Sequence, residues 1–263
     1  MKLENVSVII TNYNKGDLLV RAIDSVLKQL DKGDEVIIVD DASTGEQDKI
    51  NLKELKDNKL LKIHTNDENK GVCFSKNLGV DMAMNDIIVL LDADDTLPNK
   101  AIITIKNEFY TRELDVLYGD YTYGNADERV VVSCESISSD NVIDINKLSK
   151  NWLLLGSSPF RKSKCFSLIR FNQNFNRTDD VDFHRQLLIK GLKFGYVNQV
   201  IYDWEMFPGG NNDNISSEDI FYSHCLGMKF FVNNLNGLDY IKFIIKFLIR
   251  LSMVSVKKIC LRF

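Results

Sequence analysis

The sequence lacks the glycine-rich signatures of the common nucleotide-binding folds. No Gly-x-Gly-x-x-Gly and no Gly-x-x-x-x-Gly-Lys follows any predicted strand, which argues against a dinucleotide dehydrogenase and a P-loop NTPase. The five cysteines are far apart and form no Cys-x-x-Cys or His-paired metal spacing, which is typical of a protein from a reducing compartment. His64, His184 and His224 have no zinc-ligand spacing, so we expect them to be polar surface or core residues.

Strong charge of one sign and a leader-like apolar run are also absent. With 33 basic and 37 acidic residues, the formal net charge of -4 gives no electrostatic case for nucleic-acid binding. The apolar stretch near the start is short, and Glu4 and Asn5 interrupt it, so it does not fit a signal peptide. We therefore expect a cytoplasmic protein.

The first half of the 263-residue chain alternates short β-branched runs with longer helix-compatible stretches. Near-continuous apolar runs of this kind are typical of strands buried on both faces of a parallel sheet. The expected strands cover 6–10, 35–40, 60–65, 86–92 and 115–120, and the expected helices cover 17–29, 46–56, 71–84 and Pro98 to Arg112. The pattern predicts an α/β domain with a largely parallel sheet.

The second half of the chain is less regular. Its expected elements are a strand at 129–132, mixed strand and loop at 157–171, a helix at 181–190, a strand at 194–204 and a mobile Gly- and Asn-rich loop at 207–214. We interpret residues 1–215 as one domain, with a nucleotide-binding half at about 1–120 and an acceptor half at about 121–215. Residues 216–263 form a helical segment in this interpretation.

The end of that helical segment, residues 238–263, has a composition of its own. Its basic residues Lys242, Lys246, Arg250 and Lys257 fall within one narrow helical stripe, and most other residues are apolar. The charges interrupt the segment too often for a helix that spans a membrane. Two interpretations remain open: a basic amphipathic helix in the interface of an anionic membrane, or a helix that packs on the domain or on a partner subunit.

Polar residues follow the predicted strands at the edge where their carboxyl ends meet, which is where such sheets bind ligands. TNYNK, DDAS and DADD follow the first, second and fourth strands. Asp92, Asp94 and Asp95 repel one another unless a cation compensates them. Mg²⁺ or Mn²⁺ takes one or two carboxylates and completes its shell with water and phosphate oxygens. The acids therefore predict a metal that carries a diphosphate, although they also suit a cap of the following helix.

Four segments of the sequence resemble, in order, the motifs of the family 2 glycosyltransferases. They are VSVIITNYNKGDLLVRAIDSVLKQ, EVIIVDDAS, NKGVCFSKNLGVDMAMNDIIVLLDADD and TDDVDFHRQLLIKG. The resemblance covers about residues 5–205, and several motifs in order are more specific than any one of them. It implies a Rossmann-like GT-A fold, a nucleotide-diphosphate sugar donor, a divalent metal (Mn²⁺ or Mg²⁺) and transfer with inversion of anomeric configuration.

Residues after the first two strands match the family's nucleoside site. Thr11 and Tyr13 correspond to positions that hold the nucleoside, with the Tyr ring against the base. Asp40 and Asp41 correspond to the acidic pair that accepts hydrogen bonds from a uracil-type edge. UDP is preferred on this basis, and dTDP offers the same edge. Ordinary packing of Tyr13 and a turn or helix cap at the two acids are the alternatives.

Four later residues, Asn69, Gly71, Lys76 and Asn77, match the family's Asn-x-Gly and basic-residue-Asn positions. Gly71 permits close approach of the backbone to the ligand, and Lys76 carries a point charge for the diphosphate or a nearby acid. The alternative for Lys76 is a solvated lysine on a helix surface. Together with Asp92, these residues complete the expected donor site.

The segment TDDVDF matches the family motif whose second acid is the usual catalytic base. The match points to Asp180 as the base and to Asp179 as its acidic partner, with Asp182 as a weaker candidate. Inversion requires a carboxylate that deprotonates the acceptor hydroxyl opposite the leaving diphosphate. The same acids also suit a cap of the helix that follows, and the two roles are compatible.

The sequence departs from the family near YDWEMFPGGNN, where many members carry a His that assists metal or phosphate binding. Asn211, Asn212 or water are the substitutes there, and Trp204 is either a packing or a sugar-stacking residue. The sequence thus predicts an inverting transferase that moves a sugar from a UDP-sugar to a saccharide or lipid-linked saccharide in polysaccharide biosynthesis, at the inner face of the membrane. Two alternative functions are less consistent with the sequence. A sugar-nucleotide pyrophosphorylase would need a Gly-rich loop after the first strand, which TNYNKGDLL does not supply. A non-enzymatic, phosphate-responsive receiver domain would be shorter than this chain.

Overall fold

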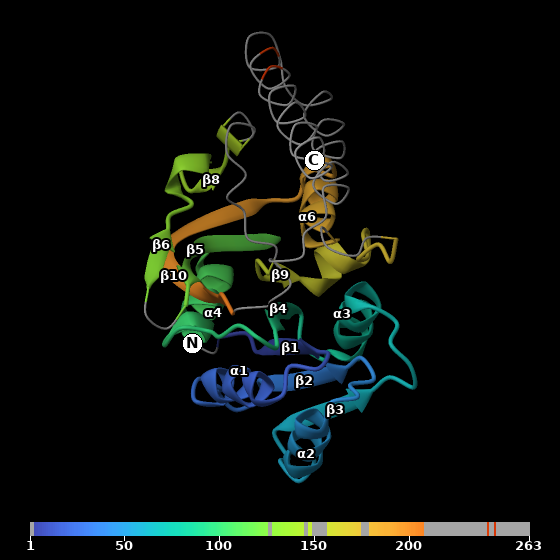
Figure 1. The fold of residues 1–263 in the computed structure, drawn as a ribbon. Coiled ribbons are helices and arrows are strands. Elements are labelled where there is room, and N and C mark those ends of the chain that lie inside the picture. The colour runs from blue at the N-terminus through green and yellow to red at the C-terminus, as the bar shows by residue number, and fades with distance from the viewer. Residues whose placement is uncertain are drawn as a thin grey trace, which may run out of the picture.

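The computed structural model describes residues 3–125, 128–144, 147–148, 157–174 and 179–207, together with Ile241 and Ile245. Helices surround one mixed sheet, as Figure 1 shows. Most of the expected loop at 207–214 and of the segment at 216–263 lies outside the described residues, as do Asn211, Asn212 and His224. Within the described part, no helix is both long enough and apolar enough to cross a bilayer.

The first half of the chain forms the parallel part of the sheet. Its strands are β1 (Val6–Asn12), β2 (Glu35–Asp40), β3 (Leu61–Thr65) and β4 (Ile87–Asp92). β1 pairs in parallel with β2 and β4, and β2 pairs in parallel with β3. All of β2 and the first five residues of β1 and β4 are buried, which explains why these sequences are continuous apolar runs. The four expected strands are confirmed.

Helices connect these strands and pack on the sheet. They are α1 (Asp17–Leu27), α2 (Glu46–Leu55), α3 (Val72–Met82) and α4 (Ala101–Thr111). The buried residues of α1 recur at spacings of three and four, which gives the helix one apolar face. These residues are Leu19, Ala22, Ile23 and Val26. The fourth helix begins at Ala101 rather than at the expected Pro98, because Lys100 has a left-handed φ of 71° and cannot belong to it.

The second half adds shorter strands and another helix. They are β5 (Val116–Gly124), β6 (Arg129–Val132), β7 (Ser138–Ser139), β8 (Val142–Ile143), β9 (Phe160–Arg161), α6 (Asp179–Ile189) and β10 (Phe194–Glu205). The strand order is β3-β2-β1-β4-β9-β5-β10-β8-β7, with β6 paired to β5. The expected strands at 129–132 and 194–204 and the helix near 181–190 are confirmed. A 3-10 turn covers Glu135–Ile137, and a π-helical turn covers Lys162–Phe166, where mixed strand and loop was expected.

The strand register decides which residues meet at the carboxyl edge of the sheet. Thr11 of β1 pairs with Asp92 of β4. β9 lies antiparallel between β4 and β5, so β5 and its parallel partner β10 run in the same direction as β4. A bridge between Thr96 and Asp203 ties the turn after β4 to the end of β10. The ends of β1, β4 and β10 therefore meet at one edge, as the largely parallel sheet predicted.

Candidate active site

The first of the expected metal-binding acids ends β4. Asp92 Oδ1 accepts a hydrogen bond from Thr11 Oγ1 at 3.4 Å. Burial raises the pKa of Asp92, Lys76 opposes this rise, and repulsion from Asp94 adds to it. The Asp92 carboxylate is therefore short of compensating positive charge, which is the electrostatic condition for binding a cation.

The next two acids of the turn have different partners. Lys15 Nζ lies 2.5 Å from Asp94 Oδ2, and both side chains are partly exposed. Asp95 is buried, and its two oxygens accept hydrogen bonds from the Tyr202 hydroxyl at 2.7 Å and from the N–H of Glu205 at 2.9 Å. Asp95 thus fixes the turn to the end of β10. Among the residues that the structure describes, no three acidic, His or Cys side chains are grouped to hold a metal ion.

A buried ion pair lies beside these acids. Lys76 of α3 and Asp179 at the start of α6 are 5% and 4% exposed, and Lys76 Nζ lies 3.0 Å from Asp179 Oδ2. Burial alone lowers the pKa of Lys76, but the surrounding carboxylates, Asp179 first, raise it above its ordinary value. The other two carboxylates are Asp92 and Asp180. The lysine is therefore charged and paired with an acid, and the alternative of a solvated lysine is wrong.

The expected base, Asp180, follows this pair in α6. Its Oδ1 accepts a hydrogen bond from the N–H of Val181 at 2.6 Å. Burial and then repulsion from Asp179 raise the pKa of Asp180 to about 6, while Lys76 holds it down. A carboxylate with this pKa is charged at neutral pH and binds a proton more strongly than an ordinary Asp, which suits a general base.

Two neighbours of Asp180 in α6 have structural partners. Asp182 Oδ2 accepts a hydrogen bond from Gln186 Nε2 at 2.6 Å. His184 is fully buried, and its Nδ1 donates to the carbonyl oxygen of Asp180 at 2.8 Å, because a carbonyl only accepts. Burial lowers the pKa of His184 to about 4, so the ring is neutral at pH 7. Both side chains therefore support the helix, and His184 is a core residue, one of the two alternatives that the sequence left open.

The acid expected to read the base, Asp41, organises the loop before α3. It accepts hydrogen bonds from the N–H groups of Lys70 and Gly71, both at 2.8 Å, and from Asn66 Nδ2 at 2.7 Å. Gly71 has a φ of 88°, a conformation that a residue with a Cβ adopts only under strain. Asp41 is thus a turn-binding acid in this structure, which is the alternative that the sequence left open.

Two acids from different elements, Asp40 and Asp48, hold the end of β1 and the loop that follows it. Asp40 is fully buried and accepts a hydrogen bond from Asn12 Nδ2 at 2.8 Å. Asp48 of α2 accepts from the N–H groups of Lys15 and Gly16, each at 3.0 Å. No local motif marks Asp48 as a loop-binding residue, because its contacts arise only when α2 packs beside the loop.

The remaining expected site residues differ in their exposure and contacts. Tyr13 is 45% exposed, and Asn69 is exposed as well. The side-chain amide of Asn77 donates to the carbonyl of Phe171 at 2.8 Å and accepts from the N–H of Phe171 at 3.0 Å. Both ends of this amide bond the backbone of Phe171. Trp204 is partly buried and packs against the core.

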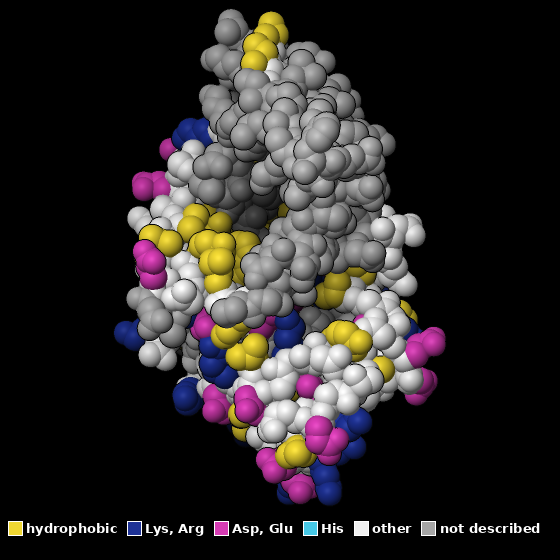
Figure 2. Space-filling model, viewed as in Figure 1, with side chains coloured by type: hydrophobic (Ala, Val, Ile, Leu, Met, Phe, Trp, Pro, Cys, Tyr) yellow, Lys and Arg dark blue, Asp and Glu magenta, His cyan; other side chains and the backbone are white. Residues whose placement is uncertain are grey.

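Charge pairs join the end of β10 to α1 and β6. Glu205 forms an ion pair with Arg21 of α1 and another, at 2.9 Å, with Arg129 of β6. Over the described part of the face in Figure 2, Lys and Arg side chains likewise lie close to Asp and Glu side chains and form no extended field of one sign.

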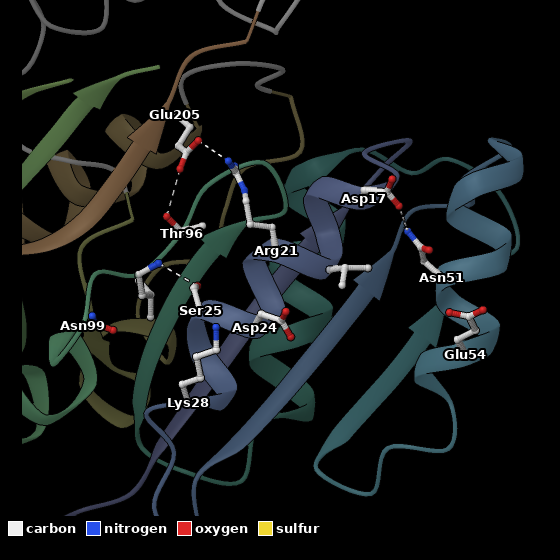
Figure 3. Close-up of a pocket in the computed structure, with 12 residues that line it drawn as sticks. Asp17, Arg21, Asp24, Ser25, Lys28, Asn51, Glu54, Thr96, Asn99 and Glu205 are labelled. Carbon is white, nitrogen blue, oxygen red and sulfur yellow. Dashed lines mark hydrogen bonds and ion pairs between the residues drawn. The ribbon is translucent and has the colours of Figure 1, made fainter. Parts of the chain in front are cut away.

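A pocket with a volume of about 690 Å³ opens along α1. Residues of α1, α2 and the segment 96–99 line it together with Glu205, as Figure 3 shows. Asp92 and Asp94 are not among its lining residues, so the pocket is separate from the expected metal position. It borders that position through Arg21, which donates a hydrogen bond to the carbonyl of Asp94.

The fold is shared with two solved proteins. The structure of S. aureus TarS 1–349 in complex with UDP-GlcNAc has a TM-score of 0.72 with this chain and is 18% identical to it, and the match covers 93% of this chain and 71% of the TarS 1–349 chain. The structure of GalNAc-T7 with UDP, GalNAc and Mn²⁺ has a TM-score of 0.62 with this chain and is 16% identical to it. The match covers 85% of this chain and 48% of the GalNAc-T7 chain. At these identities the likeness concerns the fold, which is the expected GT-A fold.

Sequence comparison then gives the family. The model of glycosyl transferase family 2 matches residues 7–179, and the chain belongs to this family. Glycosyltransferase GlyG of Streptococcus pneumoniae is 26% identical over 215 residues, which are 76% of this chain and 70% of GlyG. Glycosyltransferase GlyA of the same organism is 21% identical over 219 residues, which are 78% of this chain and 31% of GlyA. The protein is therefore a glycosyltransferase, as the motifs predicted.

Replacing Lys76 by Met should destabilise the fold, because the buried carboxylate of Asp179 loses its counter-charge. We expect the free energy of unfolding to fall by about 3 kcal/mol, as measured by urea denaturation at pH 7. Lys190→Met, at the exposed end of α6, should change it by less than about 0.5 kcal/mol. The double variant Lys76→Met/Asp179→Asn should recover part of the loss. Equal stability of Lys76→Met and the wild type would contradict a buried ion pair at this position.

Proposed function

We propose that the protein transfers a sugar from a UDP-sugar to a hydroxyl of a saccharide or lipid-linked saccharide, with inversion of the anomeric configuration. The observation that carries this proposal is the charge cluster around Lys76. Its ammonium pairs with Asp179, and its pKa responds to both Asp92 and Asp180. An acid suited to a metal and an acid suited to proton transfer thus share one buried cation. This combination serves both the departure of a diphosphate and the activation of a hydroxyl.

The donor proposal is supported by the loops after β1 and β2 and by two related folds. Tyr13 offers a ring that is 45% exposed, and an aromatic face suits a nucleotide base. The TarS structure contains UDP-GlcNAc, and the GalNAc-T7 structure contains UDP and GalNAc. Asp40 and Asp41 contribute by fixing the shape of the loops, since their oxygens already bond protein donors.

Asp92 and Asp94 fit a divalent cation in this proposal. Burial and repulsion from Asp94 raise the pKa of Asp92, so the two carboxylates lie close enough to act on one cation, and Lys15 already supplies positive charge to Asp94. Mg²⁺ and Mn²⁺ usually bind one or two protein carboxylates, and the GalNAc-T7 structure holds Mn²⁺. When bound, such an ion neutralises the charge of the leaving diphosphate. Asp95 is left out of the metal site, because it bonds Tyr202 and Glu205.

Asp180 acts as the general base in this proposal. With a pKa of about 6, it is largely ionised at pH 7 and takes the proton of the acceptor hydroxyl as that oxygen attacks the anomeric carbon. Lys76 lowers the pKa of Asp180 and so helps to keep the partly buried base ionised. Asp179 holds the lysine in place through the ion pair.

UDP should bind with wild-type affinity only when Mn²⁺ is present, because the ion links its diphosphate to the carboxylates of the turn. Removal of metal with EDTA, or Asp94→Ala, should weaken UDP binding at least about tenfold, as measured by isothermal titration calorimetry. Asp81→Asn removes an exposed acid that pairs with Arg170 and should bind UDP like the wild type. Wild-type metal dependence in Asp94→Ala would refute the proposed metal site.

Asp180→Asn should lower kcat for sugar transfer by a factor of about 100 to 10,000, because the amide cannot accept the hydroxyl proton. The measurement is product formation from a panel of UDP-sugars with free and lipid-linked saccharides as acceptors. UDP affinity should change little, and Asp182→Asn should retain most of the activity. Transfer by Asp180→Asn at the wild-type rate would exclude Asp180 as the base.

Residues 238–263 hold the enzyme at an anionic membrane surface in this proposal, close to a lipid-linked acceptor. The support is the basic stripe in the sequence. In addition, Ile241 and Ile245, one helical turn apart, are 56% and 53% exposed. An exposed apolar face beside a basic stripe is the pattern of helices that lie in a membrane interface.

Lys242→Glu/Lys246→Glu should release the protein from phosphatidylserine-containing vesicles, because both changes reverse charge beside the apolar face. Vesicle sedimentation measures this, with phosphatidylcholine vesicles as the uncharged comparison and Lys190→Glu as the control variant. Equal sedimentation of the double variant and the wild type would remove the support for the membrane proposal.

A further inference from the structure

An arginine of α1 holds the turn that carries Asp94. Arg21 Nη2 donates to the carbonyl oxygen of Asp94 at 2.7 Å, and Arg21 Nη1 donates to the carboxylate of Glu205. Figure 3 shows the guanidinium extending from α1 toward Glu205, beside Thr96. The planar guanidinium donates in two directions at once, so one side chain ties a helix both to the turn and to the end of β10.

The partners of Arg21 are themselves joined to the turn. The N–H of Glu205 donates to Asp95 Oδ1 at 2.9 Å, and Thr96 Oγ1 donates to Glu205 Oε1 at 3.4 Å. The turn is therefore held at three consecutive residues. Because the backbone carbonyl of Asp94 is one of the fixed points, the direction of its side chain is restricted too.

The same α1 region also holds the side chain of Asp94. Lys15, just before α1, lies 2.5 Å from its Oδ2, while Arg21 holds its carbonyl. Arg21 also stacks on Phe207, with its Cζ 5.0 Å from the ring centroid. Residues immediately after β10 thus meet the arginine that holds the turn, which links two ends of the site that are far apart in sequence.

We infer that Arg21 is a positioning residue for the proposed metal site. It fixes the carbonyl of Asp94 and thereby sets the direction in which the Asp94 carboxylate is presented to the ion. This inference rests on the proposed function, and Arg21 touches neither ion nor donor in it. The Arg21 side chain is 37% exposed beside the pocket, so its contacts with the turn are not explained by burial in the core.

A lysine at this position tests the inference, because an ammonium keeps the charge but lacks the fixed fork that reaches a carbonyl and a carboxylate together. Arg21→Lys should weaken Mn²⁺ binding about tenfold, the usual effect of losing a residue that orients a metal ligand. Mn²⁺ binding is measured by electron paramagnetic resonance, with Mn²⁺ alone and with Mn²⁺ plus UDP, so no turnover is needed. Thermal denaturation of the same samples should show little change in Tm.

Arg129→Lys is the matched control. Arg129 also pairs with Glu205 and has a similar exposed fraction of 32%, but its described ion pairs are with Glu205 and Asp203. The Arg129→Lys variant should therefore bind Mn²⁺ like the wild type. Weakened binding in Arg21→Lys alone supports the inference. Equal binding in the wild type and both variants, or an equal loss in both variants, overturns it.

Asp94→Ala in the same titration separates this inference from the function on which it rests. If Asp94→Ala loses Mn²⁺ while Arg21→Lys binds it like the wild type, the metal site stands and the positioning role of Arg21 falls. If Asp94→Ala binds Mn²⁺ like the wild type, the metal site itself falls, whatever Arg21→Lys does.

Discussion

The buried ion pair between Lys76 and Asp179 decides where the charges of this enzyme come together. A carboxylate and an ammonium lose most of their hydration when both are buried, and their mutual contact together with nearby charges offsets that loss. The pair joins α3 to α6 across 103 positions of the sequence. It also brings Asp92 and Asp180 into the field of one cation, so that two further acids stay near each other without both being protonated.

The acids in and around the carboxyl edge of the sheet fall into two groups: acids that bond protein donors and shape the loops, and acids that lie close to Lys76. Asp41 and Asp48 accept hydrogen bonds from backbone N–H groups and give the loops their shape, and Asp95 fixes the turn after β4 to the end of β10. Asp92 and Asp180 instead share the positive charge of Lys76 with Asp179, so each is compensated only in part. Burial raises the pKa of Asp95 as well, so a raised pKa alone does not separate the two groups. An acid-rich motif therefore does not imply that each acid in it binds a ligand.

The sequence predicted the parallel half of the fold because its strands are buried on both faces, which leaves an unbroken apolar run in each of them. It predicted the positions of Asp92 and Asp180 through the ordered motifs. It could not predict contacts made by distant segments. Asp95 forms a hydrogen bond with Glu205, 110 positions away, and Asn77 forms one with Phe171, 94 positions away. The local motifs do not predict these partners. For the same reason, the sequence does not distinguish Arg21 from the other polar residues of the amphipathic helix α1, because its contacts with Asp94 and Glu205 are long-range.

The most direct measurement is the titration of the Asp180 carboxyl group, followed by carbon-13 NMR and assigned with Asp180→Asn. We predict a midpoint of about 6 in the wild type, so the group is protonated below that pH and ionised above it. Since Lys76 lowers this pKa, the midpoint should move upward in Lys76→Met. A midpoint at the ordinary Asp value of about 3.9, the same in both proteins, would contradict a base tuned by the buried lysine.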